Sequence, residues 1–232
     1  MKMRLILLPG MDGTGELFAE FMRTIPEPKH IQALHYPTEA SPSYRQLLAM
    51  VQTMVPESEP YFLLAESYST PLAIAFAATN PPNLKGLILC AGFATSPLAG
   101  PKRTLASLIA PLLFHLRIPS AAINHFLIGP NAPEPLRAVV RAAISSVEPS
   151  VMAARLRAVL HCDMRQALGK VAVPLLYVQA KRDKLISPSC LAEIRSIRPD
   201  ARVQQIDGPH LIVQREPKHV AEAVAKFIAE CR

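Results

Sequence analysis

The chain has 232 residues, of which 50% are hydrophobic and 19% are charged, and its formal net charge is +7. This composition excludes an intrinsically disordered chain, and the length suits one domain with a sizeable buried core. The four cysteines lie far apart, with no CxxC pair and no histidine at metal-ligand spacing. We therefore expect no disulfide framework and no metal site, and we expect a reducing compartment.

The N-terminal segment MKMRLILLPG has basic residues before an apolar run, as a signal peptide does. The run covers only residues 5–8 before Pro9, which is the length of a buried strand and too short for a signal peptide. The longest apolar stretch, 104–116, contains Pro111 and is shorter than a membrane span. We expect a cytoplasmic protein without stable membrane insertion.

Short apolar runs alternate with helical patterns along most of the chain. The candidate strands are residues 4–8, 31–35, 61–65, 84–90, 175–179 and 201–206. The candidate helices between and after them are residues 15–23, 44–55, 70–79, 189–197 and 218–230. Unbroken apolar runs such as LILL and YFLLA are typical of strands buried on both faces. The alternation predicts an α/β fold with a mostly parallel sheet of about six strands and helices on both faces.

The first candidate strand is followed by a glycine-rich turn, LPGMDGTG. A phosphate-binding loop is one interpretation, but the Lys-Ser/Thr pair of a P-loop and a full GxGxxG are both missing. Ordinary turn glycines are a second interpretation. The third is an oxyanion loop, whose backbone N–H groups stabilise the negative oxygen of a tetrahedral intermediate. In that case Met11 is the candidate donor.

A serine stands between the third candidate strand and the next helix, in the sequence Ala65-Glu66-Ser67-Tyr68-Ser69. This small-x-Ser-x-small pattern fits a nucleophile elbow, where close backbone packing requires small residues at both ends. The pattern alone is weak, because a serine that caps a helix N-terminus gives the same sequence. Its position after a buried strand favours Ser67 as a nucleophile and the Tyr68 N–H as a second oxyanion donor.

The alternation of strands and helices is interrupted between residues 94 and 169, where only helical patterns occur. Prolines divide this segment into short helices. One apolar stripe at helical spacing consists of Leu105, Leu108, Ile109, Leu112, Leu113 and Leu116. We expect a helical cap of residues 94–169, inserted into a core of residues 1–93 and 170–232. Since the stripe must be buried, we expect Leu105, Leu108 and Leu112 to roof a substrate pocket at the C-terminal edge of the sheet.

Positive charge is concentrated in the same segment. Residues 101–170 contain nine basic and three acidic side chains, a net charge of +6, so the rest of the chain is close to neutral. Solvated basic helix faces are the simpler explanation, and attraction of an anionic substrate or a lipid surface is the functional one. No recognisable binding motif accompanies the charge, so we expect no nucleic-acid partner.

Two further candidates follow the last two strands. Asp183 lies in the loop after residues 175–179, and His210 follows residues 201–206 in the sequence GPH, where a base could reach an elbow serine. The chain order Ser…Asp…His is that of α/β-hydrolases. A structural role is the alternative for a single histidine among seven. The acids that compete with Asp183 fit turns or the helical segment better: Asp12, Asp163 and Asp207.

Over essentially its whole length the chain resembles the α/β-hydrolase superfamily, in LLPGMDGTG, AESYS, the loop aspartate and GPH. The resemblance implies the α/β-hydrolase fold, with Ser67 as nucleophile, His210 as general base and Asp183 as the acid that orients it. It also implies that the helical insertion is a cap and that Glu66 points away from the serine. Roughly the first ninety residues are also similar to plant phytyl-ester-synthase-like acyltransferases. The elbow departs from the family by lacking both glycines.

These features predict an esterase that acts on a small-molecule ester with an apolar acyl group and uses no cofactor. An acyltransferase or thioesterase with the same triad is the main alternative, because the sequence does not distinguish water from an alcohol or a thiol as acyl acceptor. A non-catalytic ligand-binding relative is a third possibility. The complete Ser-Asp-His set argues against it, since binding alone does not require all three residues.

Overall fold

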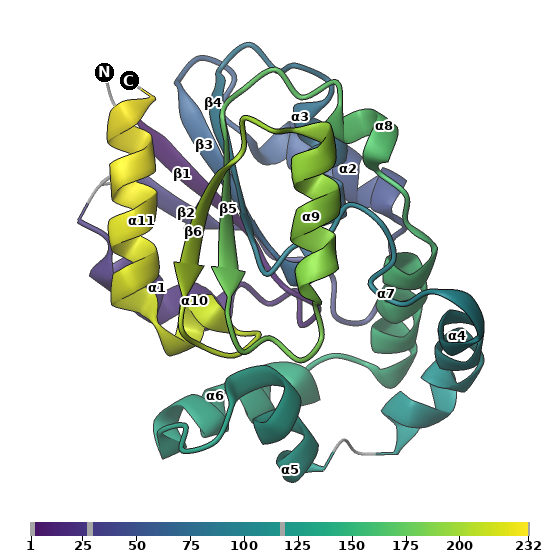
Figure 1. Cartoon of the computed structure of the whole chain (residues 1–232). Coiled ribbons are helices and arrows are strands. Elements are labelled where there is room, and N and C mark those ends of the chain that lie inside the picture. The colour runs from purple at the N-terminus through teal and green to yellow at the C-terminus, as the bar shows by residue number, and fades with distance from the viewer. Residues whose placement is uncertain (1–2, 27–29, 117–118, 232) are drawn as a thin grey trace.

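A parallel β-sheet forms the centre of the computed structural model, which describes residues 3–26, 30–116 and 119–231 (Figure 1). Its strands are β1 (Arg4–Leu8), β2 (His30–Ala33), β3 (Tyr61–Glu66), β4 (Leu84–Cys90), β5 (Leu175–Ala180) and β6 (Arg202–Ile206). They lie in the order β2-β1-β3-β4-β5-β6, and every neighbouring pair is parallel. The predicted sheet of about six mostly parallel strands is confirmed.

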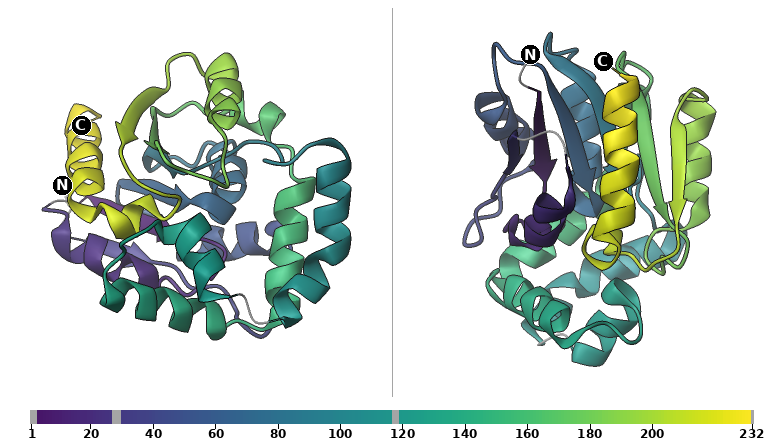
Figure 2. Two further views of the ribbon diagram at one scale, coloured as in Figure 1. Left: turned by 60° about the horizontal axis from the view of Figure 1, so that its bottom comes forward. Right: turned by 90° about the vertical axis from the view of Figure 1, so that its left-hand side faces the viewer.

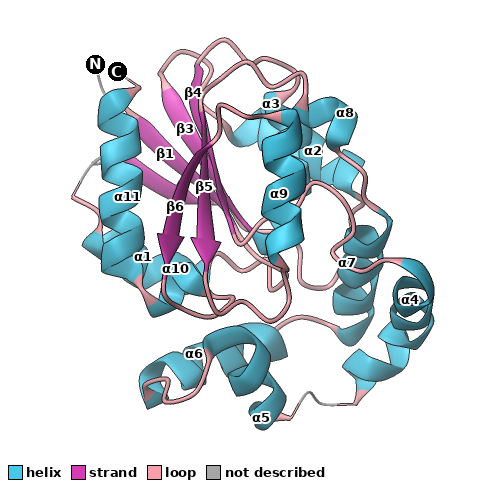
Figure 3. Ribbon diagram, viewed as in Figure 1, coloured by secondary structure: helices cyan, strands magenta, loops and turns pink. Residues whose placement is uncertain are grey.

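Helices cover both faces of this sheet (Figure 3). One face carries α1 (Ala19–Thr24), α10 (Ile212–Arg215) and α11 (Pro217–Glu230), and the other carries α2 (Tyr44–Met54), α3 (Thr70–Ala77), α8 (Arg165–Leu168) and α9 (Pro188–Ile197). In β1, Leu5 and Leu7 pack with the first set, whereas Ile6 and Leu8 pack with the second. All four side chains are fully buried, which explains the unbroken apolar run of this strand.

Between β4 and β5 the described residues form helices and one isolated antiparallel bridge, between Thr95 and Asp163. The elements are α4 (Gly100–His115), α5 (Ser120–Ile123), a π-helical turn (Asn124–Ile128), α6 (Glu134–Ser145) and α7 (Pro149–His161), followed by α8. Figures 1 and 2 show α5 and α6 beyond the edge of the sheet at which the strands end. We call residues 94–169 the inserted segment. Several of its helices lie next to the loops that follow β1, β3, β5 and β6.

The prolines of the inserted segment have two different effects. Pro101, Pro135 and Pro149 stand in the first turns of α4, α6 and α7, where a backbone N–H is not required. Pro111 instead lies inside α4, and the helix continues past it to His115. The prediction that each proline divides the segment is therefore wrong at Pro111. Although α4 is continuous, no helix among the described residues is long and apolar enough to cross a membrane.

The predicted position of the α4 leucines is corrected by the structure. Leu105, Leu108 and Leu112 are 60%, 72% and 63% exposed, so they do not roof a pocket. The helix packs on α7 through its opposite face, where Ala110 is fully buried. Small residues on that face allow the helices to approach closely and leave the large leucines outside. The side chain of Leu113 and the basic residue Arg117, both counted in the sequence patterns, lie outside the described residues.

Candidate active site

Ser67 lies at the sharp turn between β3 and α3. It begins a short 3₁₀ turn, Ser67–Ser69, directly after the last residue of the strand. Its backbone has φ of 46°, in the left-handed region that a non-glycine residue seldom adopts and that costs on the order of 1 kcal/mol. The Thr70 hydroxyl donates a hydrogen bond of 2.8 Å to the Ser67 carbonyl oxygen and supports the turn. This strained conformation is typical of a nucleophile elbow.

The structure brings Ser67, His210 and Asp183 together from three different loops. The distance between Ser67 Oγ and His210 Nε2 is 2.8 Å, and that between His210 Nδ1 and Asp183 Oδ2 is also 2.8 Å. The second carboxylate oxygen of Asp183 accepts hydrogen bonds from the N–H groups of Leu185, at 2.8 Å, and Ile186, at 2.9 Å. When the ring donates its Nδ1 proton to the carboxylate, its Nε2 lone pair faces the serine hydroxyl.

The two candidate oxyanion donors flank this serine. Met11 belongs to the glycine-rich turn after β1 and lines the same cavity as Ser67 and His210. Tyr68 follows the serine directly, and its side chain is buried away from the cavity, stacked on Tyr44 with ring centroids 5.1 Å apart. Any contribution of Tyr68 to the site must therefore come from its backbone N–H.

A buried arginine from the inserted segment holds the glycine-rich turn. Nη1 of Arg155, in α7, donates to the carbonyl oxygens of Met11, at 2.7 Å, and Asp12, at 2.8 Å. Nη2 donates to the Pro37 carbonyl oxygen at 2.8 Å. Burial lowers the pKa of this guanidinium, which nevertheless stays charged as arginine does in proteins. A Cβ atom on Gly13, which has φ of 70°, would lie only 2.6 Å from the guanidinium, so a glycine is required there.

Ser69 stands where many elbows have their second glycine, and it gives this position an additional function. Its hydroxyl donates to the Pro9 carbonyl oxygen at 2.5 Å and lies 2.8 Å from the Tyr36 hydroxyl. Since Pro9 immediately precedes the glycine-rich turn, this bond connects the elbow to the candidate oxyanion loop. In place of the missing glycine, this serine forms a hydrogen bond that connects the elbow to the glycine-rich turn.

Glu66, the residue before the nucleophile, is a buried carboxyl group. Burial raises its pKa to about 7, although a hydrogen bond of 3.0 Å from Gln214 Nε2 to its Oε2 favours the charged form. Its other oxygen, Oε1, and the side-chain amide oxygen of Gln214, also Oε1, are both buried without a partner among the described residues. Glu66 is therefore a buried structural partner of Gln214.

The serine and histidine open into an apolar cavity of about 360 Å³. Apolar side chains of the 3₁₀ turn Glu16–Phe18, α5, the π-helical turn, α6 and α7 form much of its wall: Leu17, Ile123, Leu127, Val140, Ile144 and Met152. Among the described side chains of α4, Phe114 is the one that contributes. No sequence prediction assigned Val140 or Ile144 to the pocket, although they stand four residues apart and so lie on one face of α6.

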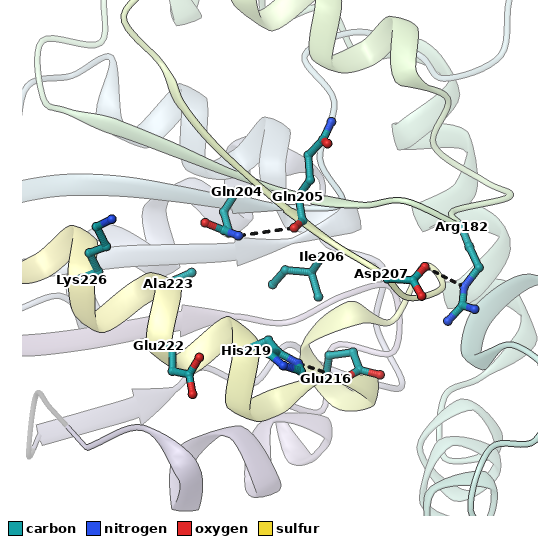
Figure 4. A pocket seen from close by; sticks show the side chains of 10 residues that line it. All are labelled: Arg182, Gln204, Gln205, Ile206, Asp207, Glu216, His219, Glu222, Ala223 and Lys226. Carbon is teal, nitrogen blue, oxygen red and sulfur yellow. Dashed lines mark hydrogen bonds and ion pairs between the residues drawn. The ribbon is translucent and has the colours of Figure 1, made fainter.

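A second groove lies away from this site, along the outer edge of the sheet between β6 and α11 (Figure 4). Its wall is largely polar, and four of its side chains form two contacts with one another. Arg182 contacts Asp207 at 3.2 Å, and His219 contacts Glu216 at 3.1 Å. The groove contains none of the residues that surround Ser67, so the apolar cavity is the better candidate for the active site.

Comparison with known proteins supports the same conclusion about the family. Residues 40–208 match the family model of serine aminopeptidase, S33. The chain belongs to this family of α/β-hydrolases. The predicted superfamily resemblance and the α/β-hydrolase fold are therefore confirmed.

The hydrolase is also similar to one curated relative and to many solved structures. It is 26% identical to phytyl ester synthase 1, chloroplastic, of Arabidopsis thaliana over 180 residues, which are 74% of this chain but 23% of the relative. A hydrolase from Pseudomonas aeruginosa PA01 has a TM-score of 0.78 at 20% identity, covering 98% of this chain and 90% of its own. A thermophilic esterase from Thermogutta terrifontis has a TM-score of 0.80 at 18% identity, covering 99% and 90%. At such identities the structural likeness establishes the fold.

Proposed function

We propose that this hydrolase is a serine esterase that cleaves carboxylic esters through an acyl-enzyme. The observation that supports the proposal most directly is the chain of two 2.8 Å contacts from Ser67 through His210 to Asp183. It stands at the wall of an apolar cavity rather than on an open surface. A serine that only caps a helix would need neither the histidine nor the left-handed backbone.

On this proposal each residue has a role. Asp183 accepts a hydrogen bond from Nδ1–H of His210 and so keeps Nε2 free to accept the Ser67 proton while Oγ attacks the ester carbonyl carbon. The N–H groups of Met11 and Tyr68 stabilise the negative oxygen that forms. His210 then returns the proton to the leaving alcohol, and a water molecule hydrolyses the acyl-enzyme by the same steps, with the histidine again as base.

The walls of the cavity favour an apolar acyl group. Apolar side chains of the inserted segment face Ser67, so a hydrocarbon chain bound there loses contact with water and gains about 0.8 kcal/mol per buried methylene. On this proposal the inserted segment is a cap on a core of residues 1–93 and 170–232. The basic residues on its outer surface are separate from the acyl pocket.

An acyltransferase is the second candidate, because the chain is similar to phytyl ester synthase 1 over 180 residues. The same acyl-enzyme would then be attacked by an alcohol in place of water. A thioesterase differs only in the leaving group, a thiol. Since the chain spans about a quarter of that relative's length, the activity of the whole relative is no more than a guide to the acyl acceptor.

The test combines covalent labelling with a panel of esters. A fluorophosphonate probe should label the wild type and not Ser67→Ala, and Ser67→Ala should lower kcat for p-nitrophenyl butyrate by several powers of ten. Ser196→Ala, an exposed serine of α9, is the matched control and should behave as wild type. Labelling that survives Ser67→Ala would refute the assignment. Transfer of the butyryl group to an added long-chain alcohol in preference to water would favour the acyltransferase.

A further inference from the structure

Exposed apolar side chains are concentrated on α4. Among the described residues nine large hydrophobic side chains are exposed, and five of them lie within residues 105–116. We call these five the α4 stripe: Leu105, Leu108, Ile109, Leu112 and Leu116. Their spacing puts them on one side of a single helix. Scattered exposed leucines need no explanation, but a contiguous set of this kind marks an interaction surface.

The α4 stripe points away from the rest of the chain. On the opposite face of α4, Ala110 is fully buried and Phe114 reaches the cavity of Ser67. Figure 2 shows α4 at the periphery of the molecule, with α7 between it and the sheet. Within the described residues no element covers the stripe, because the helix is already held from its other side.

The surroundings of the α4 stripe are cationic. Residues 67–133 contain no aspartate or glutamate. Lys102 is exposed and stands three residues before Leu105, on the same side of the helix, and Arg103 follows it. On the neighbouring α7, Arg157 is exposed and its Nε lies 3.5 Å from the Ser107 carbonyl oxygen. The first acidic residue after α7 in the sequence is Asp163, and it is paired with Arg165.

We propose that α4 docks this hydrolase on an anionic lipid surface, with the α4 stripe inserted at the level of the headgroups. A helix with an apolar face and flanking lysine and arginine residues binds such an interface through area burial and attraction to anionic lipids. A second copy of the chain is a poorer occupant, because it would bring another segment of net charge +6 against this one. Docking does not depend on ester cleavage, so it stands apart from the proposed function.

Docking would also set the distance between the lipid and the cavity. Leu112 and Phe114 lie on opposite faces of α4, one exposed and the other lining the cavity. A helix with its side chains is about 10 Å across. The cavity would therefore lie within roughly one helix diameter of the lipid surface, close to a source of apolar substrates.

The test is co-sedimentation of the full chain with vesicles that it cannot cleave. The vesicles are made of ether-linked phosphatidylcholine, with or without ether-linked phosphatidylglycerol, at low and high salt. The wild type should bind the anionic vesicles and should lose most of this binding at high salt. Leu108→Ser/Leu112→Ser should bind about tenfold more weakly or worse, and Lys102→Gln about fivefold more weakly. Met54→Ser/Val139→Ser removes two exposed apolar side chains from other helices and should bind as wild type does.

Two outcomes would overturn the proposal. One is vesicle binding that is absent, or that is equal for the wild type and Leu108→Ser/Leu112→Ser. The other is self-association in light scattering that this double variant abolishes, without vesicle binding by the wild type. The thermal melting temperature and the turnover of soluble p-nitrophenyl acetate should be unchanged in every variant, because the altered side chains are exposed and lie outside the cavity. If the wild type showed no esterase activity, the vesicle-binding measurements would still test the docking proposal.

Discussion

Replacing Arg155 by methionine tests how the inserted segment holds the candidate oxyanion loop. Arg155→Met keeps a long unbranched side chain and removes the guanidinium, leaving the carbonyl oxygens of Met11, Asp12 and Pro37 without their donors. A carbonyl left unpaired in the interior costs about 1 to 3 kcal/mol, and those of Met11 and Pro37 cost less because they are only partly buried. The variant also avoids burying a charge, which offsets several kcal/mol of that loss. We expect a net destabilisation of about 2 to 4 kcal/mol.

The effect of Arg155→Met on activity should be larger than its effect on binding. A loosened turn would misplace the Met11 N–H, and loss of one oxyanion donor costs about 10² to 10³ in kcat. KM should change little, because the apolar wall is intact. The assays are urea denaturation and kinetics with p-nitrophenyl butyrate. Arg157→Met is the matched control, since this exposed arginine lies on the same helix two residues later.

The size of each effect distinguishes the proposed role from a general packing role. Arg155→Lys keeps the positive charge but lacks the planar fork that reaches three carbonyl groups, so it should recover part of the stability and part of kcat. If Arg155→Met matches Arg157→Met in both stability and kcat, the arginine does not position the loop. If stability falls but kcat is unchanged in the folded fraction, the arginine supports the fold alone.

Three further predictions concern buried groups around the elbow. Because burial raises the pKa of Glu66 to about 7, the native chain keeps a proton that the unfolded chain releases near pH 4.5. The stability of the wild type relative to Glu66→Gln should therefore fall between pH 4.5 and 7 and stay constant above that range, as urea melts at several pH values can measure. Ser69→Ala removes the hydrogen bond to Pro9 and the contact with the buried Tyr36 hydroxyl. It should lower the free energy of unfolding by about 1 to 3 kcal/mol and should lower kcat. Unchanged kinetics would show that this hydrogen bond is dispensable for catalysis. Gly13→Ala forces a Cβ against the Arg155 guanidinium at φ of 70° and should lower the melting temperature by several degrees, and a wild-type melting temperature would contradict the close approach.

The strands and the order of the candidate triad could be predicted because both leave a direct mark on the sequence. A strand buried on both faces must be apolar at successive positions, as Ile6 and Leu7 are. Ser67 and Asp183 each follow such a strand, whereas His210 follows β6, a mostly exposed edge strand. All three strands are parallel and end at the same edge of the sheet, which brings the three residues near one another. The predicted strand boundaries are less accurate at the edge of the sheet, where β2 ends at Ala33 but the predicted strand extends to residue 35.

The packing of α4 could not be predicted from periodicity. A stripe of large apolar residues usually marks the buried face of a helix, but here the buried face is the one with Ala110. Small residues bury little area themselves, so they carry little weight in such a pattern. Which face of α4 is buried depends on the shape of α7, and α7 is distant from α4 in the sequence.

Arg155 shows the same limitation for a charged residue. It was counted among the basic residues of the inserted segment, without a role of its own. It stands four residues after Val151 and four before Val159, both buried, so it occupies the inward stripe of α7. That position was the available signal. Its three carbonyl partners come from loops more than a hundred residues earlier and leave no pattern near residue 155.

The contact between Arg155 and the turn after β1 limits how this enzyme can be remodelled. One route to a new substrate range is to exchange the whole of residues 94–169 for the corresponding helices of another hydrolase. Such a chimera would lose the guanidinium that holds Met11 and Asp12, even if the new helices fitted the cavity well. Helices α5 and α6 can be exchanged for new cavity walls, but α7 must be kept with the sheet and the turn after β1. The boundary useful for engineering, and for recombination during evolution, therefore lies before α7 and not at the end of the insertion.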